Sequence, residues 1–542
     1  MGYTTYKFDV LADHAEKAID IFSNFFMDPL FTQSGTNREV NAVDSENSKN
    51  LIVDGRRRLQ ILKALADPTH HYSKFSTGNA ITLPASIDEN DANIEEAKKA
   101  KAADVREALL TFHRRHYCPE NIFVVCVGPQ SLDTLQEWVV PRYASIKDRW
   151  NKDEKSWTQM DRVIDEAAKD APSNRYGIPP PPPKPAFSPS LQENKWPFLL
   201  TTLPLKSVRN LYLNFPLPPV RYQPDRSPLK IISFLLGNEG PGSSFAVLQD
   251  AGLLTSLSSG PRISASDQCL FQLSVTLTEE GEKKWKEVVS CLFSHCRLIH
   301  EACVKAQSEA NENQPEISSS DSGICGNYEM LTKYWKEIIT LNHLHFNQTS
   351  PGSAYGLAPN LSTSVLMNGT QKAMSADSML QESNESLPLE ELVTCSTLLN
   401  PDNCFLERCS PKAWEEQKSM GDGRNTENVE EEKASSLFGF KNEQWYDIEY
   451  HISEIDNSDV NQWKNVCPFS KLLHLPKENS YIPNNLELCP DLPEEARSPQ
   501  IDKIIDPPNL VIEDGSFGMC MHMMKIFMTY ECNNIFSMYL TF

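Results

Sequence analysis

Two carboxylates near the start of the chain have the spacing that most directly suggests chemistry. Glu39 and Glu46 stand seven residues apart in the run Asn37–Glu46, which reads N-R-E-V-N-A-V-D-S-E. Seven residues make almost two helical turns, so both side chains would leave one helix face about 10 Å apart along the axis. Such a pair suits a metal ligand with an acidic neighbour. A solvated acidic helix face is the simpler interpretation of the same spacing.

Several short strings along the chain resemble segments of one peptidase family. They occur in family order and cover most of residues 1–490 with insertions; the strings are Phe25–Leu30, Arg38–Glu46, Lys74–Leu83, Asn238–Ser243, Thr276–Gly281 and Leu475–Pro483. The chain is therefore similar to the insulysin and nardilysin branch of the M16, or inverted-zincin, metallopeptidases. The resemblance implies a family activity of peptide-bond hydrolysis by a zinc-activated water.

The resemblance also implies roles for the two carboxylates. In this family two histidines of an H-x-x-E-H helix and a distal glutamate hold zinc. Glu46 matches the distal ligand, and Glu39 matches the acidic residue one helical repeat before it. The 542 residues contain no H-x-x-E-H, whereas a catalytic zinc needs three protein ligands and an open position for water. We therefore expect no catalytic residue in this chain, no tightly bound Zn²⁺ and no hydrolysis by the chain as it stands.

The histidines elsewhere in the chain do not replace the missing motif. Three groups stand close together in sequence, at His70-His71, His113-Arg-Arg-His116 and His343-Leu-His345. Each lacks either the glutamate or the spacing that an inverted zincin requires. We interpret them as ordinary core or surface histidines.

A second candidate region is the turn Asn238-Glu-Gly-Pro-Gly-Ser243, whose glycines could suggest a phosphate loop. It lacks the G-x-x-x-x-G-K-[ST] pattern, so we favour a tight turn between two helices. By resemblance, this turn and the strand after it bind the N-terminus of a peptide through Gly242, Leu257, Ser258, Ser259 and Gly260. An edge strand binds peptides mainly through its backbone groups. Pro261 removes one backbone donor from this strand.

Apolar periodicity predicts the elements that position these residues. A helical stripe of Leu11, Ala15, Ala18, Phe22 and Phe25, with Ile19 and Phe26 beside it, ends at Asp28-Pro29. Residues 122–127 form a continuous apolar run typical of a strand covered on both faces. Further patterns predict strands at 210–215 and 271–277 and helices at 228–236 and 285–299, the first of these helices beginning at Ser227-Pro228 and ending at Gly237.

The whole pattern predicts an α+β protein with two related M16-type domains, each a mostly antiparallel sheet with helices on one face. The first domain is expected to be incomplete at its N-terminus, with an exposed sheet surface where the family's N-terminal strand and H-x-x-E-H helix would pack. The expected segments are a remnant of the zinc-site domain at 1–150, a charged and proline-rich linker at 151–195, the second domain at 196–490, low-complexity insertions near 305–330, 350–390 and 421–433, and an atypical tail at 491–542. For the run Pro179–Pro183 a stiff spacer is favoured over an SH3 or WW ligand.

Composition limits the classes of partner. The net charge of −22 makes nucleic acid an unsuitable ligand, because phosphate contacts need clustered Lys and Arg. Arg56-Arg57-Arg58 is the one compact basic run, and we expect it on a solvated helix face. The chain has no uninterrupted apolar run of 18 residues in its Met-rich tail, so no membrane span is expected. Fourteen cysteines without a C-x-x-C pair predict reduced, buried thiols, and the N-terminus lacks signal-peptide organisation, which favours the cytoplasm.

Three hypotheses for function follow. The chain is a piece of an insulysin-type or nardilysin-type zinc metalloendopeptidase, a non-catalytic homologue that binds peptides or a partner subunit, or an unstable product without activity. Expected partners are peptide substrates and either a second copy of this chain or a related M16 chain. Binding of a peptide with an unblocked N-terminus, lost on N-acetylation, would favour the second hypothesis.

Overall fold

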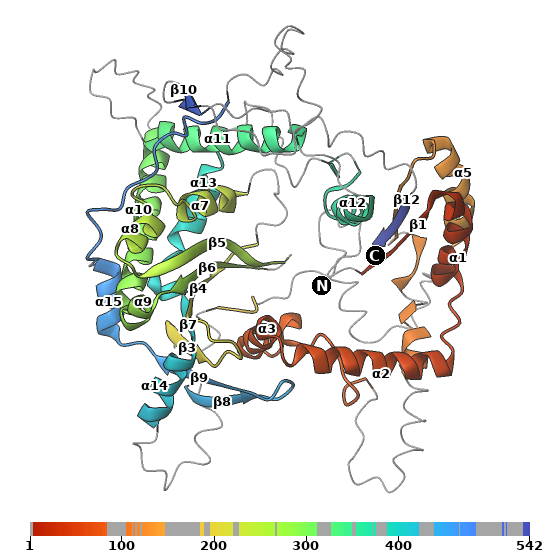
Figure 1. Ribbon diagram of the computed structural model, residues 1–542, viewed down its shortest axis with the longest axis horizontal. Helices are drawn as coiled ribbons and strands as arrows, with labels where there is room; N and C mark the ends of the chain where they lie inside the picture. Colours follow the sequence, from red (N-terminus) through yellow and green to blue (C-terminus); the bar gives the residue numbers. More distant parts are fainter. Residues whose placement is uncertain are drawn as a thin grey trace, which may run out of the picture.

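The computed structural model contains a three-stranded sheet and a seven-stranded sheet with helices packed around them (Figure 1). The described residues are 4–83, 105–110, 112–113, 116–119, 122–146, 185–188, 196–219, 227–265, 268–311, 327–348, 354–370, 372–374, 387–421, 438–465, 467–483, 512–513, 516–517 and 535–541. The run Pro179–Pro183 and most of the 151–195 and 421–433 segments lie outside these ranges. Strands β10 (Ile512–Glu513) and β11 (Ser516–Phe517) form a separate short pair.

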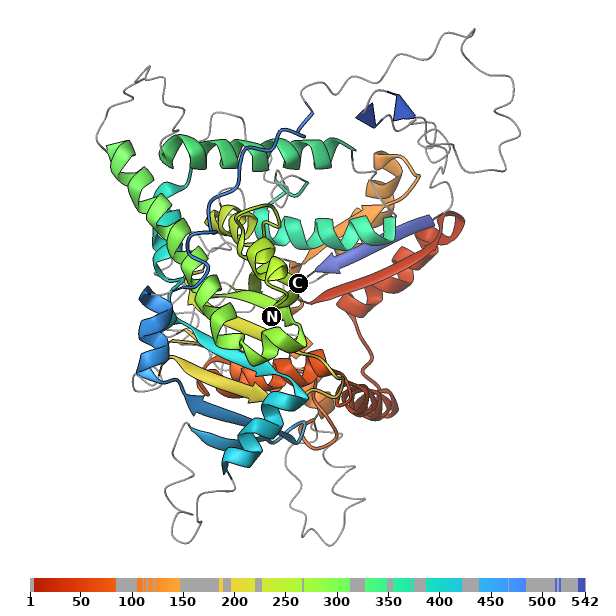
Figure 2. The same ribbon diagram turned by 60° about the vertical axis from the view of Figure 1, so that its left-hand side comes forward.

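The small sheet joins the two ends of the chain. Its order is β1 (Thr5–Leu11), β12 (Ile535–Thr541) and β2 (Phe123–Val127), with both pairs antiparallel. The last strand thus lies between two strands from the first quarter of the sequence (Figure 2). Every residue of β1 and β2 is half-buried or exposed, so the prediction that residues 122–127 are covered on both faces is wrong. The exposed sheet surface where further elements of the family would pack stays a prediction.

Three helices accompany the small sheet: α1 (Ala15–Met27), α5 (Leu132–Tyr143) and α12 (Ala354–Asn368). The core between α1, α5 and the sheet includes Ala15, Ile19, Phe22 and Phe26 from α1. Phe25, in contrast, is 55% exposed, and Leu11 belongs to β1. The buried stripe therefore differs by one helical position from the predicted one. Helix α12 contacts β12 and β2 and occupies part of the 350–390 segment that we expected to be a low-complexity insertion.

The large sheet has seven strands in the order β5-β6-β4-β7-β3-β9-β8. Their bounds are β3 Phe198–Thr202, β4 Asn210–Leu217, β5 Leu254–Ser264, β6 Cys269–Leu277, β7 Phe405–Cys409, β8 Gly439–Glu443 and β9 Ile448–Glu454. All neighbours are antiparallel except β3 and β7. The α+β class with a mostly antiparallel sheet is confirmed.

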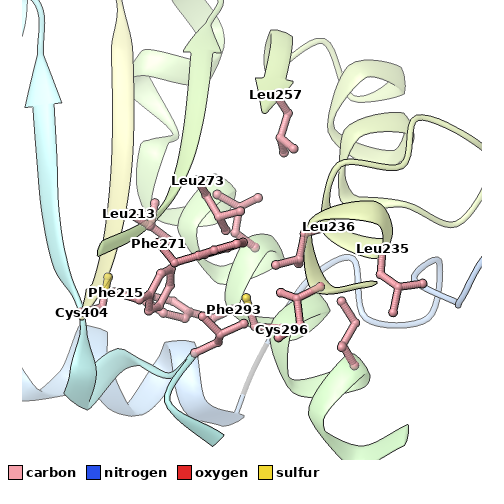
Figure 3. Packing of buried hydrophobic residues seen from close by; sticks show 14 of the residues in the cluster. Leu213, Phe215, Leu235, Leu236, Leu257, Phe271, Leu273, Phe293, Cys296 and Cys404 are labelled. Carbon is pink, nitrogen blue, oxygen red and sulfur yellow. The ribbon is translucent and has the colours of Figure 1, made fainter. Parts of the chain in front are cut away.

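One face of the large sheet is covered by a helical layer. Its members are α7 (Pro228–Leu236), α8 (Ser244–Asp250), α9 (Glu279–Lys283), α10 (Trp285–Asn311), α11 (Asn327–Gln348), α13 (Leu389–Thr397) and α15 (Asn457–Asn465), while α14 (Pro411–Gly421) contacts β3 and β7. Figure 3 shows the core under this layer, where Phe215 and Phe271 from paired strands meet Phe293 of α10. Strict alternation on β4 and β6 places these apolar residues on the helical side.

The opposite face receives a helix from the first part of the chain. Helix α2 (Gln33–Asn50) leads to α3 (Asp54–Leu65), and α3 packs Ile61, Leu62 and Leu65 against Phe198 and Phe405. Arg58 of α3 pairs with Glu407 of β7 at 2.7 Å, and its side chain is only 12% exposed. The expectation that the Arg56–Arg58 run is wholly solvated is therefore wrong at Arg58. Successive helical residues point about 100° apart, so only one of the three arginines faces the sheet.

Gly281, the last residue of the string Thr276–Gly281, lies where close packing leaves no room for a side chain. Thr278 Oγ1 accepts the Gly281 N–H at 2.9 Å and donates to Gly252 O at 2.7 Å, which holds α9 against the turn before β5. A Cβ on Gly281 would lie 1.7 Å from Leu253 O. We expect Gly281→Ala to lower the free energy of unfolding by about 1–3 kcal/mol, as overpacking does, and denaturant midpoints would measure the loss.

Gly55 of α3 is the matched control for this substitution. A Cβ there meets nothing within 4 Å, so Gly55→Ala should raise stability by about 0.5–1 kcal/mol through helix propensity. Equal effects of the two substitutions would contradict the packing explanation.

Among the described residues, no helix has the length and apolar character needed to cross a membrane.

Candidate functional site

The predicted helix that carries Glu39 and Glu46 is confirmed as α2. Thr32 caps its start, because Thr32 Oγ1 accepts the Gly35 N–H at 3.2 Å. Glu39 and Glu46 are both exposed, and the buried residues of α2 are Thr36 and Asn47. The helix therefore presents its two carboxylates to solvent.

The described residues do not fit a catalytic zinc ion. Among them, no group of three or more His, Cys, Asp or Glu side chains is arranged to hold a metal, whereas catalytic zinc needs three protein ligands. The histidines singled out in the sequence are placed elsewhere: His70 Nδ1 accepts the Tyr72 N–H at 3.0 Å, and His113 stacks on Tyr117 with ring centroids 4.5 Å apart. The role of Glu46 as a third ligand, with Glu39 beside it, stays a prediction.

The turn Asn238–Ser243 connects α7 to α8, as the sequence predicts. Asn238 Oδ1 accepts the Gly240 N–H at 2.8 Å, and the Ser243 N–H donates to Gly240 O at 3.1 Å. Ser243 then caps α8 by accepting the Ala246 N–H at 3.1 Å. These bonds define a tight turn with its backbone groups engaged locally, and no phosphate is needed to explain its glycines.

Gly242 is required in this turn for two separate reasons. Its φ is +84°, a left-handed conformation that costs other residues about 1–2 kcal/mol. A Cβ at this position would also lie 2.4 Å from the His474 ring. The His474 N–H donates to Gly242 O at 3.0 Å. Thus His474, which the sequence gave no spacing signal to find, lies directly on the candidate peptide-binding turn.

The other candidate residues lie on β5, at one end of the large sheet. β5 pairs with β6 alone among the described strands. Leu257 is buried in the core, where Figure 3 shows its side chain on the side of α7 and its Leu235 and Leu236. Ser258 is exposed, and Gly260 is half-buried. Leu257 can therefore contribute only its backbone to a ligand.

Ser259 ties this strand to the turn. Its Oγ donates to Ser233 O at 2.9 Å, in the last part of α7 that leads into Asn238–Ser243. A Cβ on Gly237, the residue that ends α7, would lie 3.0 Å from the same Ser259 Oγ. The structure thus brings the β5 candidates and the α7–α8 turn into one neighbourhood. Pro261 lies opposite Phe271 just before an irregularity in the pairing, a position that an edge strand tolerates.

A buried serine–histidine pair lies under the turn. His295 Nδ1 lies 3.0 Å from Ser244 Oγ, and both residues are 0% exposed. Burial lowers the pKa of His295 to about 4, which keeps the ring neutral. Because no substrate reaches it, the pair supports the start of α8 and is not a hydrolytic dyad. The groups that can bind a peptide here are therefore the backbone N–H and C=O groups of the edge strand β5.

Three profiles of a single peptidase family match successive parts of the chain. "Insulinase (Peptidase family M16)" matches residues 1–69, "Peptidase M16 inactive domain" matches 104–306, and "Middle or third domain of peptidase_M16" matches 346–516. Together they cover most of the sequence. The chain belongs to the M16 peptidase family. This identification confirms the insulysin-like resemblance of the sequence strings.

Relatives of this M16 chain include named insulin-degrading enzymes. It is 28% identical over 485 residues to "Insulin-degrading enzyme-like 1, peroxisomal" of Arabidopsis thaliana, covering 90% of this chain and 40% of that protein. It is 29% identical over 492 residues to human "Insulin-degrading enzyme", covering 90% and 39%. The chain thus spans about two-fifths of the length of these relatives.

A solved structure supports the fold. The crystal structure of pitrilysin matches with a TM-score of 0.61 at 18% identity, covering 87% of this M16 chain and 40% of pitrilysin. At this level of identity the agreement is one of fold.

Proposed function

We propose that this M16 chain supplies a peptide-binding part of a zinc metalloendopeptidase of insulin-degrading-enzyme type, and that the chain alone does not hydrolyse the peptide. The observation that carries the proposal is β5, an edge strand whose Ser259 is tied to the helix leading into the Gly242 turn. An extended peptide would add to β5 by backbone hydrogen bonding, with its N-terminus directed to the turn. Peptide substrates of the named relatives are consistent with this ligand class.

The same proposal assigns catalysis to residues that this chain does not carry. Its sequence has no H-x-x-E-H, and the described residues offer no three-ligand metal cluster. The proposal therefore implies a partner, a related M16 chain that carries the motif. Glu46 would supply a carboxylate ligand to the zinc of that partner. The rival hypothesis is a non-catalytic homologue that acts by itself; such a protein would bind peptides at the same β5 site without a partner chain.

A cytoplasmic location forms part of the proposal. All ten cysteines in the described part of the chain are free thiols, in keeping with the reduced thiols that the sequence predicts. Reduced thiols are the normal condition of proteins in the cytosol.

Peptide binding can be tested with alternately N-methylated peptides. A peptide added to an edge strand donates every second N–H to it. Methylating the amides of one alternate set should weaken binding strongly, whereas methylating the other set should leave it nearly unchanged, as measured by fluorescence anisotropy. Equal effects of the two sets, or no binding of the unmodified peptide, would overturn strand addition at β5.

The N-terminal end of the site has a matched pair of variants. Gly242→Ala and Gly252→Ala both place alanine at a positive φ, but only the Gly242 Cβ would meet His474. We expect Gly242→Ala to reduce peptide affinity several-fold and Gly252→Ala to change stability more than affinity. N-acetylation of the peptide should reduce affinity for the natural chain and have little further effect on Gly242→Ala. Cleavage of a fluorogenic peptide by the purified chain would refute the non-hydrolytic part of the proposal.

A further inference from the structure

Two cysteines from distant parts of the chain meet at the edge of the main core. Cys291 lies on α10 and is 0% exposed, whereas Cys467 follows α15 and is 8% exposed. The two thiols are hydrogen-bonded to each other. Both residues belong to the same hydrophobic cluster, in which α10 packs against α15. Both residues are buried, and the small remaining exposure of the pair belongs to Cys467.

Hydrogen-bond donors converge on the Cys467 sulfur. The Phe469 N–H donates to Sγ at 3.3 Å, and the hydroxyls of Ser290 and Ser294 donate as well. Ser294 Oγ accepts from Arg297 Nη2 at 3.1 Å, so its own proton is available for the sulfur. Donors of this kind stabilise a thiolate more than a thiol.

The titration of the cysteines follows from these surroundings. The hydrogen bond from Cys291 and the other donors lower the pKa of Cys467 to about 6. The bond to Cys467, together with burial, raises the pKa of Cys291. Burial raises the pKa of Cys296 to about 12 and that of Cys303 to about 11 on the same helix. Reactivity toward electrophiles should therefore concentrate at Cys467.

We propose that Cys467 is a peroxide-reactive thiol and that Cys291 converts its oxidised form into an intramolecular disulfide. The Cys467 thiolate attacks one oxygen of hydrogen peroxide, the O–O bond breaks, and the departing hydroxide takes a proton to become water. Cys467 is then a sulfenic acid. The Cys291 sulfur attacks the Cys467 sulfur, the S–O bond breaks, and the hydroxyl leaves with the Cys291 proton as a second water. Two thiols are oxidised and one peroxide is reduced.

The disulfide would act on the segment that reaches the candidate peptide site. Residues 467–475, here termed the strap, begin at Cys467 and end beside Gly242, where the His474 N–H donates to Gly242 O. Phe469, Leu473 and Leu475 of the strap pack against the core. A covalent bond at Cys467 would fix the first residue of the strap to α10. Oxidation would therefore slow the local opening that exposes the Gly242 turn.

The test is peptide mapping of the full chain after brief treatment with hydrogen peroxide. Remaining thiols are blocked with N-ethylmaleimide before digestion. We expect a cross-linked peptide containing Cys291 and Cys467, removed by dithiothreitol, and slower amide hydrogen exchange in the strap of the oxidised protein. In Cys291→Ser, Cys467 should instead accumulate as a sulfenic acid that dimedone labels, because no second thiol resolves it. Cys303→Ser, on the same helix, should form the cross-link as the natural chain does.

Either of two results would overturn the proposal. One is oxidation of Cys467 no faster than that of Cys296 or Cys303 in the natural chain, a comparison that needs no variant to fold. The other is a dimedone-labelled Cys467 in the natural chain with no cross-link to Cys291. Circular dichroism of each variant would establish that a lost cross-link does not reflect unfolding.

Discussion

Arg58→Ala is expected to lower the free energy of unfolding by about 3–5 kcal/mol, the typical cost of removing one partner from a buried ion pair. Glu407 is fully buried, and Arg58 Nε lies 2.7 Å from its Oε2. The guanidinium also stacks over the Tyr212 ring, with Arg58 Cζ 3.7 Å from the ring centroid. Alanine would leave the carboxylate under α3 without its cation. Urea denaturation of the purified variant would measure the loss.

Two further variants separate charge burial from other causes. Arg56 lies on the same helix and is exposed, so Arg56→Ala should change stability by no more than about 0.5 kcal/mol. Replacing the pair together, as Arg58→Met with Glu407→Leu, should recover most of the stability, because apolar residues can substitute for a buried pair. If Arg58→Ala matched Arg56→Ala, the ion pair would not be what holds α3 on the sheet.

Acidification is expected to destabilise the protein through His295. Burial lowers the pKa of this ring from its ordinary 6.5 to about 4, whereas the unfolded chain keeps the ordinary value. Between these two pH values the unfolded state binds more protons, so stability falls as the pH falls from about 6.5 to about 4. Above pH 6.5 the full contribution is present. The gap corresponds to about 3 kcal/mol.

Comparison with His295→Gln isolates this contribution from the carboxylates that titrate in the same range. The variant should be less stable than the natural chain at pH 7, because it loses the contact with Ser244 Oγ. Its loss of stability between pH 7 and pH 4 should be smaller by about 3 kcal/mol. Denaturation midpoints at both pH values give the comparison, and parallel pH profiles would show that His295 does not titrate as its burial implies.

Elements with strong local signals were predictable from sequence. Helix α7 begins at Pro228 and ends before Gly237, as the Ser227-Pro228 and Gly237 signals predict, although Ser227 makes no side-chain cap bond. Apolar and polar residues alternate along strand β6, as a half-buried strand requires. Gln272 is nevertheless buried, and its Nε2 donates to Asn214 Oδ1 on the neighbouring strand β4. The local sequence pattern thus predicts whether a segment is a helix or a strand, whereas the residue opposite on the neighbouring strand determines whether a polar side chain is buried.

Features that depend on distant partners were not predictable. Helix α12 contains Gly356 and Pro359, which both disfavour helix, and its packing against β12 and β2 stabilises it despite this low helix propensity. Arg58 and Glu407 are 349 residues apart, so no periodicity relates them. The candidate turn was found because its glycines stand together in sequence, whereas His474 reaches it only through the fold. The family resemblance identified the candidate residues on β5, but only the structure shows which of them are exposed.

The position of β12 has a consequence for synthesis on the ribosome. Leu11 pairs with Ile535, so β1 emerges more than 500 residues before the strand that it pairs with. At about 5–20 residues per second, β1 waits roughly half a minute to two minutes for its neighbour. During that interval the nascent chain exposes unpaired edges on β1 and β2, which makes this stage the one at which a chaperone that shields extended segments would matter most.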